Sequence, residues 1–261
     1  MNVIILLLTA LLPVILIGLY IYFKDKNKEP KKLLFGLFTS GIGSIIITLI
    51  ITMILNSIFP ILVENRENLN LIELLFNVFI GISLVEEFSK WIFTYFIGYN
   101  NKEYDHIYDM IVYAVYVSLG FAAVENIMYV LQQGMTVAIM RALLAVPGHA
   151  CYGIFMGYFL TLAKLAEKNG NKKISNKNKC LSIIVPTILH GIYDYCLFAS
   201  VDFLLVLFFA FVIVMYIYAI KHIKKVSSVE RNIFIKNKYC SKCCKQATGN
   251  YCENCGTKID V

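Results

Sequence analysis

Residues 71–97 read LIELLFNVFIGISLVEEFSKWIFTYFI, and this stretch decides the fold class. A helix that spans a bilayer needs roughly 20 predominantly apolar residues, and the stretch is longer than that. It also contains Glu86, Glu87 and Lys90, whose charges are costly inside lipid. An apolar helix with such residues predicts a membrane span whose polar face is turned toward other helices.

The composition of the whole chain agrees with this prediction. Of its 261 residues, 59% are hydrophobic and 16% are charged, whereas soluble domains average about half apolar and about a quarter charged. This balance excludes a water-soluble globule, a disordered chain and a fibrous protein. Seven stretches are long and apolar enough to cross a bilayer: 3–23, 33–60, 71–97, 107–131, 135–163, 180–199 and 203–220. We therefore predict an all-α polytopic bundle of about seven spans.

The placement of lysines predicts which ends of the spans face the cytoplasm. Lysines are concentrated in loops 24–32 and 164–179 and in the tail after Ile220. In the loops on the opposite side, Arg66 is the only basic residue. Because cytoplasmic loops carry an excess of Lys and Arg, we expect a cell-membrane protein with an external N-terminus and a cytoplasmic C-terminus. The net charge of +7 follows from this bias. It favours contact with anionic lipid, and we expect no nucleic-acid partner.

Four of the spans carry ionisable groups where lipid would otherwise surround them. These residues are Glu86, Glu87, Lys90, Glu125 beside Asn126, Arg141, His149, His190 and Asp194. Glu86 and Lys90 are four residues apart, as are His190 and Asp194, so each pair shares a helix face. Such groups must face one another or a water-filled cavity. Imidazoles and carboxylates at a common depth suit a divalent metal that activates water for hydrolysis.

Each of these residues also has an interpretation without catalysis. A lone intramembrane histidine often forms a hydrogen bond to a neighbouring helix, and Glu86 with Lys90 could be only a buried ion pair. We expect Arg141 to extend toward the outer interface. Gly153 and Gly157 form a GxxxG pattern, which we assign to helix packing.

Four sequence elements resemble the motifs of PrsW-type intramembrane metalloproteases. EEFSK at 86–90 is similar to the EExxK motif of that family, and FAAVEN at 121–126 to its FxxxEN element. PGH at 147–149, continuing to Gly157, resembles the third, histidine-bearing element, and HGIYD at 190–194 resembles HxxxD. All four occur in the order of the family on successive spans, over roughly residues 70–200.

The resemblance implies a glutamate-dependent metalloprotease of the bacterial cytoplasmic membrane. It gives Glu86 the role of general base, with Glu87 assisting or ligating. The implied metal ligands are His149, His190 and Glu125. The implied supporting residues are Asp194, which would orient His190 or ligate beside it, Lys90 and Asn126. Zn²⁺ is the implied catalytic metal, and a single-span membrane protein such as an anti-sigma factor is the implied substrate. Cleavage would occur on the extracytoplasmic side, in stress signalling.

Two other functions stay open on the sequence. CAAX prenyl proteases are more distantly similar, but their first element has the spacing EExxxR. A cation- or proton-coupled transporter would use Glu86, Glu125 and His190 as a relay, although no inverted repeat is visible. Cleavage of a membrane-anchored substrate distinguishes the protease from the transporter.

The C-terminal tail carries two CxxC pairs, Cys240 with Cys243 and Cys252 with Cys255. Four thiolates bind Zn²⁺ tetrahedrally, and this spacing is typical of a small structural zinc ribbon. A redox dithiol is the alternative, which a reducing cytoplasm disfavours. The predicted organisation is a transmembrane protease domain at 1–221, a linker at 222–238 and a ribbon at 239–261. We expect the ribbon to contact a cytoplasmic partner in regulation or assembly.

Overall fold

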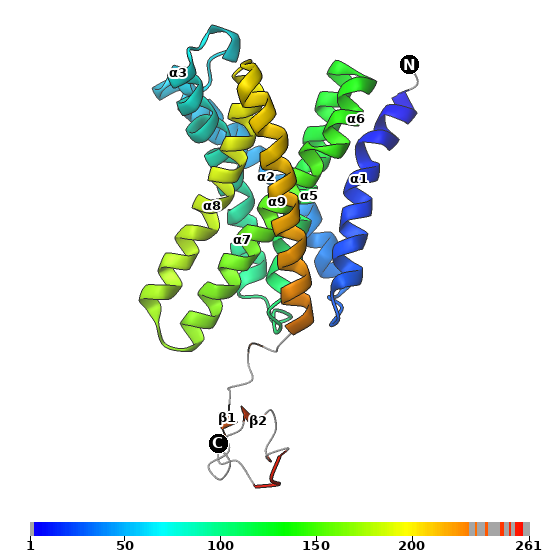
Figure 1. The fold of residues 1–261 in the computed structure, drawn as a ribbon, viewed down its shortest axis with the longest axis vertical. Helices are drawn as coiled ribbons and strands as arrows, with labels where there is room; N and C mark the ends of the chain where they lie inside the picture. Colours follow the sequence, from blue (N-terminus) through cyan, green and yellow to red (C-terminus); the bar gives the residue numbers. More distant parts are fainter. Residues whose placement is uncertain are drawn as a thin grey trace.

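The computed structural model describes residues 3–229, 233, 238–239, 246–247, 251 and 254–257. Its membrane part is a bundle of helices, which confirms the all-α prediction (Figure 1). The long helices are α1 (Val3–Lys24), α2 (Lys31–Ile58), α5 (Asp109–Gln133), α6 (Met135–Leu143), α7 (Ala145–Lys168), α8 (Lys172–Phe198) and α9 (Asp202–Val229). Two 3₁₀ turns, η1 (Pro60–Leu62) and η2 (Arg66–Asn68), lie between α2 and the next helix.

Within the described residues, six helical segments are long and apolar enough to cross a membrane by length and composition. They match six of the seven predicted spans, with α6 and α7 counted as one segment, Met135–Lys168. The remaining prediction, 71–97, corresponds to a continuous helical run of mixed geometry. Its parts are α3 (Leu71–Phe76), the π-helical η3 (Asn77–Leu84), α4 (Val85–Phe93) and the π-helical η4 (Thr94–Tyr99). π-Helical turns are rare and occur frequently at functional sites.

Several helices extend further than hydropathy predicts. α7 continues to Lys168 and α8 begins at Lys172, so the predicted loop 164–179 is mostly helix with a tight turn at Gly170, where φ is 74°. α9 runs to Val229, into the range 222–238 that we expected as linker. Lysine is a good helix former, so these solvated ends continue the helix although they are not apolar.

The central helix of the bundle is α5. It packs against α1, α2 and α7. In its most apolar stretch of 18 residues, 78% of the residues are buried, whereas the corresponding share is 22% for α2 and for α9. The outer helices leave large apolar side chains exposed. A helix that is apolar all round suits a lipid environment rather than water. Residues on α5 are therefore held on several sides, and residues on α2 and α9 mostly face lipid.

α5 and α7 approach each other closely at the two glycines of the GxxxG pattern. A Cβ at Gly157 would lie 2.5 Å from the Met110 carbonyl oxygen and 2.6 Å from Ile111 Cα. A Cβ at Gly153 would lie 2.8 Å from Ser118 Oγ. Small residues allow such backbone contact between membrane helices, and this confirms the packing role predicted for both glycines.

The loops of the bundle divide between two ends. In Figure 1 the loop 25–30, the turn between α7 and α8 and the end of α9 lie at the bottom, whereas α3 and the start of α1 lie at the top. We name these the basic end and the α3 end. The lysine-rich loops that the sequence assigns to one side of the membrane thus meet at one end of the bundle.

The predicted ribbon falls largely outside the described residues. Cys240, Cys243 and Cys252 are not among them. Cys255 is described, with its Sγ 3.2 Å from Thr257 Oγ1. The strands β1 (Lys238–Tyr239) and β2 (Gln246–Ala247) pair antiparallel in this tail.

Candidate active site

Four helices bring the predicted acids and imidazoles together in the half of the bundle nearer the α3 end. Glu86 comes from α4, Glu125 from α5, His149 from α7 and His190 from α8. All four line one cavity of about 260 Å³. The helix is interrupted at Leu144, between α6 and α7, so His149 lies in the second turn of α7. Pro147 is tolerated there because the first turn of a helix does not use the proline N–H.

Lys90 is a cation buried between these groups. Its Nζ lies 2.5 Å from Glu87 Oε1, 3.2 Å from His149 Nδ1 and 3.9 Å from Glu86 Oε2, and its side chain has no exposure. A buried ammonium needs such partners to offset its desolvation. Because an ammonium only donates, Nδ1 of His149 accepts, and a neutral ring then carries its proton on Nε2.

Glu125 connects His149 to Arg141. Glu125 Oε2 lies 2.7 Å from His149 Nε2 and 2.9 Å from Arg141 Nη2. Arg141 Nε also donates to Asn126 Oδ1 at 2.9 Å, and Asn126 Nδ2 donates to the Ala10 carbonyl on α1 at 2.8 Å. The expectation that Arg141 extends to the outer interface is therefore wrong. A largely buried carboxylate is a strong partner for a guanidinium, and the helix break at Leu144 lets Arg141 turn inward.

His190 is oriented by Glu87 rather than by Asp194. Its Nδ1 lies 2.9 Å from Glu87 Oε1, and Glu87 has no exposure. Since a carboxylate only accepts, Nδ1 carries a proton, and Nε2 faces Glu86 Oε2 at 4.0 Å and Asp194 Oδ2 at 3.5 Å. The contacts thus reverse two expected positions: Glu87 lies behind the ring, and Asp194 lies on the cavity side.

Tyr152 is a site residue that sequence analysis missed. Its ring stacks on His190 with centroids 4.8 Å apart and an interplanar angle of 17°, and it lines the cavity. The two imidazole centroids are 5.4 Å apart. Tyr152 follows His149 by three residues, so it shares a helix face with that histidine, and this spacing is the signal that could have identified it.

The donor atoms around the cavity fit a divalent metal in kind. Glu86 Oε2 is buried and has no hydrogen-bond partner among the described residues. His190 Nε2 is at best weakly bonded to Glu86 and Asp194, because separations of 4.0 and 3.5 Å are long for hydrogen bonds. A metal ion or a proton between these atoms would satisfy them. Imidazole nitrogens and carboxylate oxygens are the usual ligands of catalytic zinc.

A larger cavity adjoins this one. Its volume is about 1040 Å³, and its walls come from α2, segment 62–71, η3 and the end of α8. The two cavities share Arg66, Glu86 and Phe198, and the Arg66 guanidinium lies 3.9 Å from the Phe198 ring centroid. The larger cavity is at the upper limit of small-molecule sites, about 1,000 Å³. Glu86 is therefore accessible from a space large enough for several residues of polypeptide.

The part of the chain that forms both cavities is similar in sequence to known proteins. A family model described as PrsW family intramembrane metalloprotease matches residues 29–220. The chain is 36% identical to "Protease PrsW" of Oceanobacillus iheyensis over 206 residues, which are 79% of this chain and 88% of the relative. It is 31% identical to the Bacillus subtilis protein of that name, covering 80% and 90% of the two chains. For the Clostridioides difficile protein the identity is 26% and the coverage 89% and 95%. No solved structure matches the chain.

The family match includes every helix that contributes to the cavity. It decides against the transporter and the prenyl-protease alternatives, because neither describes this family. The converging carboxylates and imidazoles, the six candidate spans and the family match lead to the same identification. The chain belongs to the PrsW family of intramembrane metalloproteases.

Proposed function

We propose that this protease uses Glu86 as a general base to cleave a single-span membrane protein near the α3 end of the bundle. The observation that carries the proposal is that Glu86 Oε2 is buried and has no hydrogen-bond partner among the described residues, in the cavity that His149, His190 and Glu125 also line. A general base must be within reach of the proton that it removes. A carboxylate oxygen not engaged by another donor is available for this task.

Zn²⁺ held by His149, His190 and Glu125 is the proposed cofactor, with Asp194 as a further oxygen donor beside His190. When bound, such a metal lowers the pKa of a coordinated water toward neutrality. Metal ligands must be deprotonated. A neutral His149 ring that binds a metal through Nε2 would carry its proton on Nδ1, where Lys90 Nζ lies, so the Lys90 contact would have to rearrange. His190 already carries its proton on Nδ1.

The residues behind the ligands keep the two rings in place. Glu87 holds Nδ1 of His190, and Lys90 bridges Glu87 and His149. Arg141 holds Glu125 and is itself fixed by Asn126. Residues that orient ligands in this way typically change metal affinity or activity by 10- to 100-fold when they are mutated. We assign Glu87 this orienting role rather than a second catalytic one.

The larger cavity supports a protein segment as substrate. Its polar lining includes Thr52, Asn65 and Asn70, which can pair with backbone groups of a substrate that leaves its helix. Unpaired backbone groups are costly at membrane depth. With the basic end in the cytoplasm, the cavity lies on the extracytoplasmic side. A single-span protein of the anti-sigma class, as the family resemblance implies, fits this location.

The test is cleavage of a tagged single-span anti-sigma reporter in membranes. We expect Glu86→Gln and His190→Ala each to reduce fragment release at least ~100-fold at unchanged protein level. Glu103→Gln and His222→Ala are matched controls away from the cavity and should cleave at the wild-type rate. Undiminished cleavage in both cavity variants would refute the assigned roles. Cleavage of an unrelated single-span reporter but not of the anti-sigma reporter would refute the substrate class alone.

We also propose that Cys240, Cys243, Cys252 and Cys255 bind a structural Zn²⁺ in the tail. The spacing of the two CxxC pairs supports this, as does the β1–β2 pairing on either side of the first pair. Cys252→Ser should lose one zinc equivalent per chain, whereas Cys180→Ser, on α8, should lose none. Equal zinc content in both variants would exclude the ribbon.

A further inference from the structure

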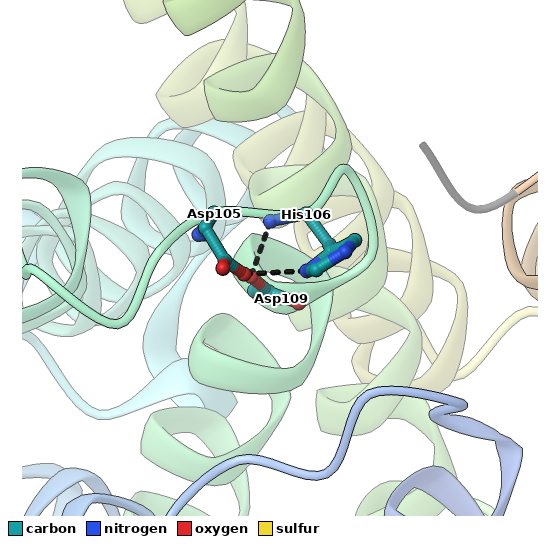
Figure 2. Close-up of side chains that lie close together, drawn as sticks. All are labelled: Asp105, His106 and Asp109. Atoms are coloured by element: carbon teal, nitrogen blue, oxygen red, sulfur yellow. Dashed lines mark hydrogen bonds and ion pairs between the residues drawn. The ribbon is translucent and has the colours of Figure 1, made fainter. Parts of the chain in front are cut away.

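Asp105, His106 and Asp109 form a second polar cluster, at the basic end of the bundle (Figure 2). They lie in the loop before α5 and at its first residue. At 1.5 Å per residue, Asp109 is about 24 Å along α5 from Glu125. Within the described part of the chain, these are the only three His, Cys, Asp or Glu residues whose ligand atoms all lie within 4.8 Å of one another.

Asp109 has one carboxylate oxygen engaged and one unpartnered. Its Oδ2 accepts from the backbone N–H of Asp105 at 3.0 Å and from that of His106 at 2.7 Å. The side chain has no exposure, and Oδ1 has no hydrogen-bond partner among the described residues. A buried polar atom without a partner costs about 1–3 kcal/mol, more when it is charged. This oxygen therefore calls for a positively charged or proton-bearing neighbour.

Glu29 brings a further buried carboxylate to the cluster from the loop between α1 and α2. It is 5% exposed and is near enough to Asp109 for the two carboxyl groups to interact electrostatically. Tyr113 donates its hydroxyl to Glu29 Oε2 at 2.8 Å. Among the described residues, no lysine or arginine is ion-paired with Glu29, Asp105 or Asp109. Two buried carboxyl groups thus lie near each other, and among the described residues neither is paired with a lysine or arginine.

The outer part of the cluster is accessible to solvent. His106 Nδ1 contacts Asp105 Oδ1, and the two side chains are 19% and 46% exposed. Two of the three candidate ligands are therefore partly open to solvent, whereas Asp109 is buried. One imidazole with several carboxylates is a mixed nitrogen and oxygen donor set, which suits divalent first-row metals such as Mn²⁺ and Zn²⁺.

We propose that Asp105, His106 and Asp109, together with Glu29, bind a divalent first-row metal ion. The ion supplies the positive charge that the unpartnered Asp109 oxygen and the nearby Glu29 carboxylate lack. By joining these residues it ties the loop 25–30 to the start of α5, so the site is a clamp at the basic end.

The same cluster contacts Ile233, a described residue that follows α9 in the chain. The backbone N–H of Ile233 donates to the Asp105 carbonyl at 2.7 Å, and Ile233 is 6% exposed. Lys168 Nζ lies 3.4 Å from the Ile233 carbonyl oxygen. A metal that fixes Asp105 would therefore also fix the residue that holds Ile233.

The test is Mn²⁺ binding to the full-length protein in detergent after removal of metal with a chelator. Mn²⁺ is the probe because thiolates prefer softer ions, so the cysteine tail does not compete. The titration uses the His190→Ala variant as the parent protein, because this substitution weakens metal binding at the proposed active site. We expect a single Mn²⁺ with nitrogen coupling in pulsed EPR, and a rise in Tm on its addition.

His106→Ala and Asp109→Asn should each weaken Mn²⁺ binding at least ~10-fold and abolish the Tm rise. His222→Ala, an imidazole on α9 outside the cluster, should bind as the parent does. His106→Ala is the safer variant, because Asp109 also accepts the loop N–H groups that position Asp105. The proposal would be overturned if His106→Ala bound Mn²⁺ as tightly as the parent, or if the parent bound no Mn²⁺. A proton shared between Glu29 and Asp109 would then be the remaining way to compensate the two buried acids.

Discussion

The two polar clusters near opposite ends of α5 differ in how their carboxylates are compensated. At the candidate active site, Lys90 lies between Glu87 and His149 behind the cavity, and Arg141 pairs with Glu125 in its wall. At the basic end, the described residues provide no such cation, and Asp109 keeps an unpartnered buried oxygen. Cations supplied by the chain pair with Glu87 and Glu125 in the first cluster. The proposed second site takes its cation from solution, so adding a divalent metal should raise the Tm through this cluster. In the first cluster, the Tm should fall when a cationic side chain of the protein is removed.

The largest effect should come from removing the buried cation of the active site. Lys90→Met keeps the length of the side chain but leaves Glu87 buried without its ion pair. Breaking a buried pair in this way costs about 3–5 kcal/mol, which thermal unfolding in detergent would measure. Lys102→Met is the control, because Lys102 is 91% exposed, and its Tm should not change. An unchanged Tm for Lys90→Met would show that the acids do not need this cation.

A smaller loss should follow from separating α5 and α7. Gly157→Ala places a methyl group 2.5 Å from the Met110 carbonyl oxygen, and such overpacking costs about 1–3 kcal/mol. Met110 follows Asp109, so Mn²⁺ affinity at the basic end should fall as well. Gly36→Ala is the control, since nothing lies within 4 Å of a Cβ there. Equal Tm values for the two variants would contradict the close approach of the helices.

Arg141 sharpens the comparison within the active site. Arg141→Gln removes the charge beside Glu125 while the fold keeps its other buried pairs, so we expect cleavage about 10-fold slower, with little change in Tm. Arg141→Lys should recover only part of the rate, because an ammonium lacks the planar fork that reaches Glu125 and Asn126 together. If Arg141→Gln cleaved at the wild-type rate, Arg141 would have no role in positioning Glu125 for catalysis.

The smallest effect should come from the ring that stacks on His190. Tyr152→Leu removes an aromatic contact worth about 0.5–1.5 kcal/mol, which corresponds to a loss of roughly 2- to 10-fold in cleavage rate. Tyr152→Phe keeps the stacked ring and should cleave nearly as fast as wild type. A larger loss in Tyr152→Phe than in Tyr152→Leu would show that the hydroxyl matters and the stacking does not.

The sequence was sufficient to select residues that the structure gathers around one cavity, but not to assign every contact. Glu86, Glu125, His149 and His190 stand out because charged and polar groups are rare in apolar spans. Arg141 was misplaced because an arginine near a span end can reach the interface or turn inward, and only the break at Leu144 decides which. Glu87 and Asp194 were exchanged because each lies within a turn of a recognised motif residue, and sequence spacing does not specify which ring nitrogen a neighbour meets.

The sequence alone determined that the chain is a membrane bundle, which residues are too polar for lipid, and where the lysine-rich loops are. These properties follow from transfer free energies, which belong to each residue and its near neighbours. Only the tertiary structure decided which groups meet across helices. It placed Glu87 against Nδ1 of His190 and the Tyr113 hydroxyl against Glu29, residues far apart in the chain. Such contacts depend on helix rotation and close packing, which are set by all the neighbouring helices together.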